Sequence, residues 1–360
     1  MTTNALSPLI IKTANIKHLV LSGGGLLGIS YIGLFKYLEE HNAISQISTI
    51  TGCSAGAIFG TLLAIGYTSV ELNSIIKSLN FKDYLNITAD SIINFIKLKG
   101  FDSGKNIMDF IKKSIKDKTD NENITFNQVY EKYNIKLKIG VSNLTSSKFE
   151  LFDNNKTPNL PIYQAINASI AIPFIFEPVI INKQVYCDGG LLDNLPIEYM
   201  LNLETTNNTN TDGNTHVDEL DTLGIYLMNK FATMTCDNYQ TITLSHYLYT
   251  LSYAYINESI YRKINNENIK INKKYKIIVF EIPCDIMTFI KISATHEDID
   301  NIINIAYTTT KNNLDNTTKI NNTTKIDTLD NQSKIDTLDN QSKIDTLDTL
   351  DNQTNLNKII

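Results

Sequence analysis

Three short motifs place small or nucleophilic residues where the chemistry of acyl transfer would need them. Residues 52–56 read Gly-x-Ser-x-Gly around Ser54, a glycine-rich segment begins at Gly23, and two glycines directly follow Asp188. A serine hydroxyl attacks a carbonyl well only when a base takes its proton, and the oxyanion that forms needs N–H donors. The three motifs therefore offer one candidate for each of these needs.

The Gly-x-Ser-x-Gly motif stands between a β-branched run, Gln46–Thr51, and an apolar run with helical character. This strand-turn-helix context is the one in which a nucleophilic serine is held in a strained turn. Gly52 and Gly56 fit such a turn because a Cβ at either position would collide with neighbouring backbone. The context predicts Ser54 as a nucleophile at the carboxyl edge of a sheet. The alternative is an unreactive Gly/Ser helix start.

The turn Gly23-Gly24-Gly25 follows an expected strand, His18–Leu21, and precedes a helix. If this strand and the strand before the serine are neighbours, the two turns lie side by side. The amides of the glycine turn and that of Ala55 could then converge on one oxygen, which predicts an oxyanion hole.

The same turn, continued to Gly28, also satisfies the dinucleotide-binding pattern Gly-x-Gly-x-x-Gly. A nucleotide-binding fold of that type needs an acidic residue near the end of the second strand. Here the second strand, Gln46–Thr51, carries no acid and leads into the serine turn. The sequence therefore favours acyl transfer over nucleotide binding.

Asp188 is the candidate base because it follows a short strand, Val185–Cys187, and because Gly189 and Gly190 permit a close irregular turn. Asp-Gly-Gly is by itself an ordinary turn sequence. A Ser-His-Asp triad is the competing arrangement, and its histidine would come after the acid in the chain. Three histidines satisfy this order. His216 lies in a polar segment, His246 in an expected helix at 241–259 and His296 at a helix start, and none has a motif around it.

Short β-branched runs alternate with helical patterns, which predicts an α/β fold with a mostly parallel central sheet and helices on both faces. The expected strands are Lys17–Leu21, Gln46–Thr51, Ile135–Ser142, Phe149–Phe152, Val185–Cys187, Leu223–Leu227 and Tyr275–Ile282. The expected helices are Leu27–Glu40, Ser54–Gly66, Lys105–Lys116, Phe126–Tyr133 behind a Thr125-x-x-Gln128 capping box, and one that begins near Thr295.

Composition narrows the partners and cofactors. The 360 residues carry a net charge of −6 without a dense basic block, which argues against nucleic acid and means that any peripheral membrane contact would be apolar. The four cysteines form no metal-ligand pattern, so we expect no metal and no other cofactor. Residues 1–17 lack the features of a secretory signal, and we therefore expect an intracellular protein, cytoplasmic or peripherally membrane-associated.

The chain divides into an expected catalytic domain at 16–311, a Thr- and Asn-rich insertion within it at 202–221, and a low-complexity tail at 312–360. Within the tail, a nine-residue unit beginning at Lys325 repeats at Lys334 and Lys343. The unit is too short and polar to bury a core, so we expect disorder in the tail. A small solenoid or an oligomerising arm is the alternative.

Together these motifs resemble the patatin-like phospholipase family over about residues 16–282. Besides the glycine turn, the serine motif and the Asp188 turn, the sequence has two further family patterns in the expected order: Ala-Ser-x-Ala-x-Pro from Ala168, and Asn-Leu-Pro from Asn194. The resemblance implies a Ser54–Asp188 dyad that needs neither histidine nor metal and that hydrolyses acyl esters of phospholipids or neutral glycerolipids. Leu26 and Leu27 stand where many relatives carry an arginine. This departure leaves a preference for anionic head groups open.

Two other functions remain compatible with these residues. An ordinary α/β-hydrolase esterase would use the triad, and a catalytically idle relative would keep the fold to bind lipid. The apolar run Ile92–Leu98, which ends in lysines, could be an interfacial lid or simply a core helix.

The composition of the tail gives a first prediction. Removing residues 316–360 should leave ester hydrolysis and the thermal midpoint nearly unchanged, because the repeats have no amphipathic face to bury. Activity on a short acyl ester and a thermal melt of the truncated chain would check this. Aggregation or inactivity of the truncated protein would mean that the repeat is structural.

Overall fold

The computed structural model describes residues 16–84, 91–199, 221–230, 243–265, 275–284 and 294–315. All of them fall within one compact unit, residues 11–315. The expected insertion at 202–221 lies outside the described residues except for Asp221. Of the tail expected at 312–360, residues 312–315 are the end of a helix in which Leu314 is buried, and the rest lies outside the described residues. No helix among the described residues is both long enough and apolar enough to cross a membrane.

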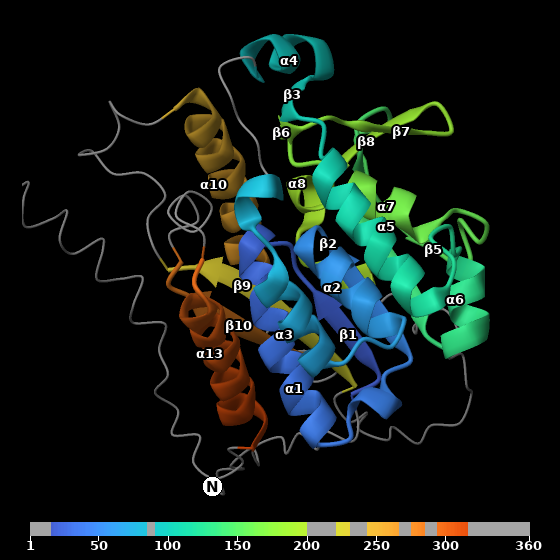
Figure 1. The fold of residues 1–360 in the computed structure, drawn as a ribbon, viewed down its shortest axis with the longest axis vertical. Coiled ribbons are helices and arrows are strands. Elements are labelled where there is room, and N and C mark those ends of the chain that lie inside the picture. The colour runs from blue at the N-terminus through green and yellow to red at the C-terminus, as the bar shows by residue number, and fades with distance from the viewer. Residues whose placement is uncertain are drawn as a thin grey trace, which may run out of the picture. The chain divides into compact units, whose positions relative to one another are not determined.

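An eight-stranded sheet forms the centre of the unit, with strand order β10-β9-β1-β2-β4-β8-β7 and β5 paired to β4 (Figure 1). Pairing is parallel from β10 to β4 and antiparallel for β5, β8 and β7. The strands are β1 (His18–Leu21), β2 (Thr49–Cys53), β4 (Lys136–Asn143), β5 (Lys148–Asp153), β7 (Val179–Ile181), β8 (Gln184–Asp188), β9 (Thr222–Asn229) and β10 (Tyr275–Ile282). The predicted α/β class with a mostly parallel sheet is confirmed.

A second sheet pairs two short strands, β3 (Gly100–Asp102) and β6 (Phe174–Phe176), which the sequence analysis did not predict. The helices are α1 (Tyr31–Glu40), α2 (Ala55–Ala64), α3 (Ser69–Ser78), α4 (Ser91–Leu98), α5 (Lys105–Thr119), α6 (Phe126–Tyr133), α7 (Ile162–Ser169), α8 (Gly190–Asp193), α10 (Leu244–Asn265) and α13 (His296–Asp315). Shorter 3-10 helices are η2 (Gly25–Ser30), η3 (Ile44–Gln46) and η4 (Phe81–Tyr84).

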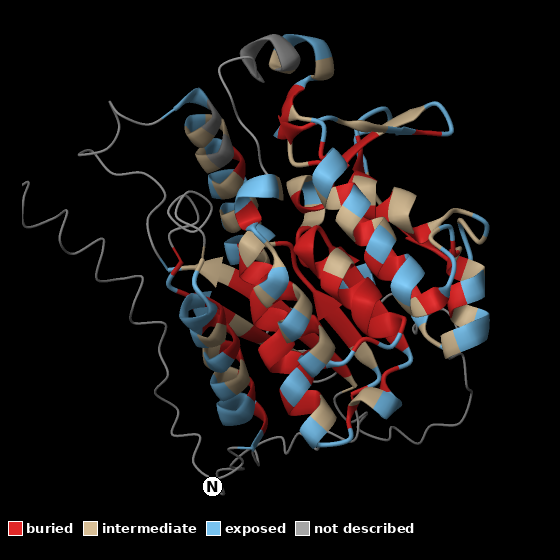
Figure 2. Ribbon diagram, in the orientation of Figure 1, coloured by how far each residue is buried: buried red, intermediate tan, exposed pale blue. Residues whose placement is uncertain are grey.

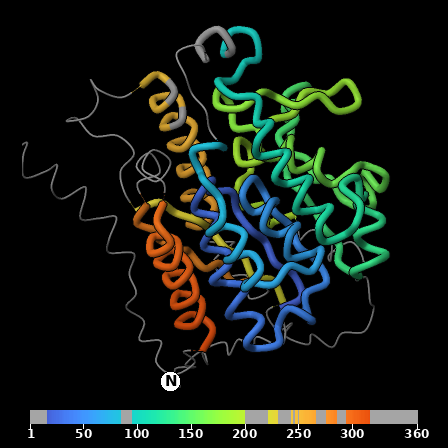
Figure 3. The backbone as a smooth tube through the Cα atoms, in the orientation of Figure 1, coloured from blue at the N-terminus to red at the C-terminus, as the bar shows by residue number. Residues whose placement is uncertain are grey.

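Hydrophobic side chains cover the sheet on both faces, and its central strands β1, β2, β4 and β9 are almost wholly buried (Figure 2). Along β1, Leu19 and Leu21 pack into the larger core with α1, α2 and α13, whereas Val20 between them packs into a smaller core with α10. This alternation follows from the two-residue period of a strand. The backbone tube in Figure 3 shows α13 running beside α1. Gly33 permits this close packing, because a Cβ there would lie 2.1 Å from the Ile303 carbonyl oxygen.

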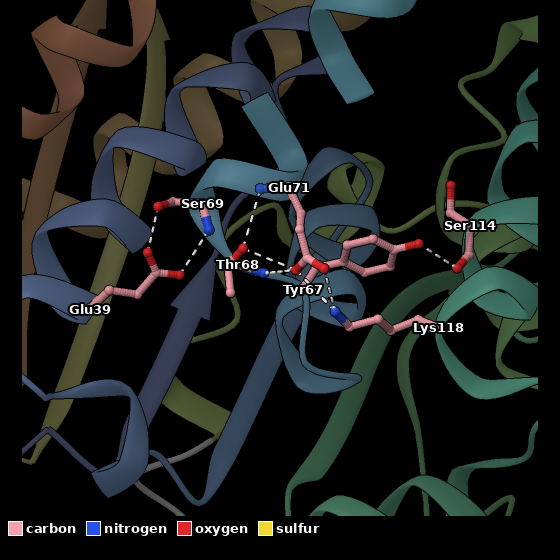
Figure 4. A network of polar contacts seen from close by, with 7 residues as sticks. All are labelled: Glu39, Tyr67, Thr68, Ser69, Glu71, Ser114 and Lys118. Carbon is pink, nitrogen blue, oxygen red and sulfur yellow. Dashed lines mark hydrogen bonds and ion pairs between the residues drawn. The ribbon is translucent and has the colours of Figure 1, made fainter. Parts of the chain in front are cut away.

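A polar network fixes the start of α3 between α1 and α5 (Figure 4). Thr68 and Glu71 form a capping box, and the Lys118 ammonium donates to Glu71 over 2.7 Å. These hydrogen bonds, with that of Lys118 first, lower the pKa of Glu71 to about 2. Glu39 accepts a hydrogen bond of 2.8 Å from the Ser69 N–H. The network therefore fixes α1, α3 and α5 relative to one another through a helix cap, a hydrogen bond and one ion pair.

Candidate active site

Ser54 sits in the turn between β2 and α2, with φ 50° and ψ −120°. A non-glycine residue with positive φ is strained, and surrounding packing must maintain it. The two motif glycines explain how. A Cβ at Gly52 would lie 2.2 Å from the Gly56 carbonyl oxygen, and one at Gly56 would lie 2.2 Å from that of Leu21. The backbone of α2 thus presses against β1 and β2 so closely that only glycine fits.

The side chain of Ser169 stabilises the strained backbone of Ser54. Its hydroxyl accepts a hydrogen bond of 2.9 Å from the Ser54 N–H and donates one of 2.6 Å to the Gly140 carbonyl. Ser169 is fully buried at the end of α7, and Gly140 belongs to β4. One side chain therefore ties the turn after β2 to the neighbouring strand.

Asp188 ends β8, antiparallel to β4, and its side chain is directed to Ser54. The residue is only 3% exposed. Burial raises the pKa of Asp188 to about 6, while hydrogen bonds from the Ser54 side chain and the Gly190 N–H act to lower it. The Gly190 bond to Asp188 Oδ1 measures 2.7 Å. The two residues chosen from the sequence as nucleophile and base therefore meet in a buried place.

The glycine turn lies against Ser54, as expected from the parallel pairing of β1 with β2. A Cβ at Gly23 would come within 2.8 Å of the Ser54 Cβ, and one at Gly28 within 2.8 Å of the Ala55 Cβ. Gly25 adopts φ 56°, in the left-handed region that favours glycine. Glycines thus stand where two chain segments approach closely or where the chain turns sharply.

The backbone N–H groups of the turn are not equivalent. That of Gly23 donates to Asn194 Oδ1 over 2.8 Å. Those of Gly24, Gly25 and Ala55 donate to no group within the described part of the chain. The last three are therefore the N–H groups free to bind an oxygen.

Comparison with known proteins identifies the family. The sequence profile of the family described as "Patatin-like phospholipase" matches residues 19–201. This chain belongs to the patatin-like phospholipase family. It is 29% identical over 291 residues to "Uncharacterized protein R571" of Acanthamoeba polyphaga mimivirus, covering 76% of this chain and 93% of that protein. It is 32% identical over 200 residues to "Probable lipid hydrolase 463L" of Invertebrate iridescent virus 6, covering 55% and 68%.

Among solved structures, VipD from Legionella pneumophila is similar with a TM-score of 0.48 and 18% sequence identity. The match covers 87% of this chain and 71% of VipD. The match of the family profile to residues 19–201 confirms, at the level of the family, the resemblance predicted from the motifs.

Asn194 is the residue of this patatin-like site whose importance the sequence motif did not explain. Its Nδ2 donates to the Gly23 carbonyl over 3.2 Å while its Oδ1 accepts from the Gly23 N–H, so one amide fixes both polar groups of that peptide position. A Cβ at Gly190 would lie 2.7 Å from Asn194 Oδ1 and 3.0 Å from Asp188 Oδ1. Asn194 therefore positions the glycine turn relative to the turn that carries Asp188.

A largely buried ion pair lies next to the two hydrogen bonds between Asn194 and Gly23, which we call the clamp. Lys263 of α10 lies 2.6 Å from Asp193 Oδ1, and its ammonium also donates to the Leu195 carbonyl over 3.1 Å. The two side chains are 14% and 12% exposed. The pair fixes α10 to the segment between Asp188 and Leu195. Local sequence patterns could not predict this ion pair, because Asp193 and Lys263 are 70 residues apart.

The histidines of the alternative triad occupy other places. His296 starts α13, where its Nε2 lies 3.1 Å from the Lys77 carbonyl, and His246 lies on α10. Among the described residues, no histidine is hydrogen-bonded to Ser54 or Asp188. His216 lies outside them. The described His, Cys, Asp and Glu residues also form no group that could hold a metal ion.

The clamp gives a prediction that separates positioning from simple stability. Asn194→Leu keeps the branched shape of the side chain with larger end groups and removes both hydrogen bonds to Gly23, so kcat on a soluble short-chain ester should fall by on the order of 10–10². Asn143→Leu is the matched control, because it removes another buried asparagine that bonds Glu150 over 2.8 Å, away from the glycine turn. Both variants should lose thermal stability. Equal kcat in the two variants would contradict the positioning role.

Proposed function

We propose that this patatin-like protein hydrolyses carboxylic esters of phospholipids or other glycerolipids, with Ser54 as nucleophile and Asp188 as its general base. The observation that carries the proposal is the buried contact of the Ser54 hydroxyl with a carboxylate whose pKa is raised to about 6. The relative named as a probable lipid hydrolase supports a lipid ester as the substrate class.

The reaction needs only groups of this chain and water. Ser54 Oγ bonds to the ester carbonyl carbon as its proton passes to the Asp188 carboxylate. The tetrahedral intermediate collapses, the carbon–oxygen bond to the alcohol breaks, and Asp188 returns the proton to that alcohol. Water then attacks the acyl-serine with Asp188 again as base. The fatty acid leaves and Ser54 regains its proton.

Burial of Asp188 makes a carboxylate suitable for this work. A solvated aspartate has a pKa near 4 and is a weak base toward an alcohol. Removal from water raises that pKa because the charged form loses hydration, and no cation is among the groups that act on it. A base of pKa about 6 is still ionised at neutral pH and accepts a proton more readily.

The N–H groups of Gly24, Gly25 and Ala55 would bind the oxyanion. Gly23 was part of the predicted hole, but its N–H is engaged by Asn194, which gives it a positioning role in the observed conformation. Ala55 is the first residue of α2, so its N–H also lies at the positive end of a helix dipole. Negative charge that develops on the substrate oxygen would be stabilised there.

The choice between dyad and triad rests on one set of variants. Asp188→Asn keeps the shape but removes the base, so the rate should fall by on the order of 10²–10⁴, and Ser54→Ala should abolish turnover. His216→Ala, His246→Ala and His296→Ala should each stay within a few-fold of the parent. Labelling with a fluorophosphonate should depend on Ser54. A histidine variant as damaged as Ser54→Ala would replace the dyad with a triad.

The raised pKa of Asp188 also predicts a pH profile. The base works only when it is deprotonated, so kcat/KM should be nearly constant above about pH 7 and fall as the pH drops through the pKa of about 6. Direct measurement of fatty acid released from a soluble ester avoids indicators that titrate in this range. The residual activity of Asp188→Asn should lack this inflection. An inflection retained in that variant would assign the titration to another group.

A further inference from the structure

One helix near the site presents an apolar stripe to solvent. Leu244, Tyr247, Leu251 and Tyr255 of α10 are spaced three or four residues apart and so share one side of the helix. They are between 39% and 58% exposed, on the side where a surface helix ordinarily carries polar residues. The stripe ends one turn later at an exposed ion pair, Arg262 with Glu258 at 2.7 Å.

The stripe continues onto neighbouring elements. Leu248 of α10 packs against a small core made by Phe101 and Phe176, which joins α10 to β3 and β6, and Phe95 of α4 stacks on Phe101 with ring centroids 4.7 Å apart. Figure 1 shows α4, β3, β6, β7 and the first turns of α10 at one end of the unit, at the top of the view. Three further exposed apolar side chains come from these elements, namely Ile96, Phe174 and Ile180. We call the four stripe residues and these three the apolar face.

The apolar face borders the end of the sheet that holds the dyad. β6 and β7 lead directly into β8, whose last residue is Asp188, and the Asp188 N–H bonds the Ala171 carbonyl just before β6. The Lys263–Asp193 pair fixes the same helix α10 to the segment that follows Asp188. Whatever binds the apolar face is therefore held beside the ester-cleaving groups.

Charge indicates which kind of apolar partner fits. The chain carries a net charge of −6, and the exposed charges beside the apolar face include Lys97 in α4, Lys99 just after it, Lys183 between β7 and β8, and Glu177 after β6. These scattered lysines are fewer than the clusters of about four to eight basic residues that recognise anionic lipid. A zwitterionic bilayer needs instead apolar and aromatic side chains at the head-group boundary. Tyrosines such as Tyr247 and Tyr255 suit that boundary because one end is apolar and the other polar.

We propose that the apolar face docks on the surface of a zwitterionic glycerophospholipid bilayer, with the stripe of α10 at the boundary between head groups and acyl chains. This inference rests on the proposed function for its lipid substrate. Docking there sets the dyad end of the sheet against the lipid, so that an ester can reach the buried Ser54 from the bilayer without crossing water.

The test uses the full chain with Ser54→Ala, which prevents hydrolysis, and sucrose-loaded vesicles of palmitoyl-oleoyl-phosphatidylcholine. The parent should sediment with the vesicles, and added salt should change this little because the contact is apolar. The double variant Leu251→Glu, Tyr255→Glu should partition at least about tenfold more weakly, because charged side chains are costly at that depth. Val70→Glu is the matched control, since Val70 is a well-exposed apolar residue at the start of α3, beyond the far end of α2 from Ser54.

Three outcomes would overturn the docking proposal: a parent that does not bind the vesicles, a double variant that binds them as the parent does, or a Val70→Glu variant that loses binding equally. A parent that is dimeric by light scattering and made monomeric by the double substitution would instead show that a second copy covers the face. Thermal melts establish that each variant is folded. Hydrolysis of a soluble ester by the chain with Ser54 intact is measured separately, so failure of the catalytic proposal and failure of docking are distinguishable.

Discussion

The site depends on how closely the backbone of α2 approaches β1 and β2. Gly56 lies so near the Leu21 carbonyl, and Gly52 so near that of Gly56, that a single methyl group at either position has no room. This contact forces the sharp turn in which Ser54 takes a positive φ. It also sets the distance between the serine turn and the glycine turn, because β1 leads directly into Gly23 and Gly24. Packing of backbone against backbone thus places Ser54 beside the N–H groups of the glycine turn.

The electrostatic surroundings of Asp188 differ from those of Asp193. Asp188 is buried without a cation beside it, an arrangement that raises the free energy of its charged form and therefore its pKa. A nearby lysine would stabilise the carboxylate but would also make it a poorer base. The partly buried Lys263 of α10 is paired with Asp193 instead. Asp188 and Asp193 therefore have different partners, a hydroxyl for the first and an ammonium for the second.

Much of the fold could be predicted from local sequence patterns. Where the structure differs from the prediction, the physical reason can be identified. Periodicity and caps predicted the central strands and helices such as Phe126–Tyr133, whose capping box is observed. The strand predicted at Gln46–Thr51 begins instead at Thr49, because Ile44–Gln46 form a 3-10 turn. Strands β3, β6 and β7 have three residues each, too few for a periodic pattern to emerge.

In the candidate site, too, some residues could be predicted from local sequence, whereas others act through contacts between distant parts of the chain. Ser54, Asp188 and the motif glycines could be chosen because strand-turn-helix context and glycine-rich turns are local properties. Ser169 and Asn194 appeared only within family motifs, since their contacts with Ser54 and Gly23 join positions 115 and 171 residues away. That Gly23 gives its N–H to a side chain could not be predicted from a glycine run, because any of the three amides could equally have pointed to the substrate.

The segment from Asp188 to Leu195 concentrates several of these relations in eight residues. Asp188 contacts Ser54, Gly190 leaves room for the Asn194 side chain, Asp193 binds the lysine of α10, and Asn194 fixes the glycine turn. Removing one partner of a buried ion pair leaves an uncompensated charge, which costs more than replacing both. Loss of Lys263 alone would therefore disturb the segment that positions Asp188 and the glycine turn, although Lys263 touches neither. In this way the attachment of α10 and the contact of Asp188 with Ser54 depend on one short piece of chain.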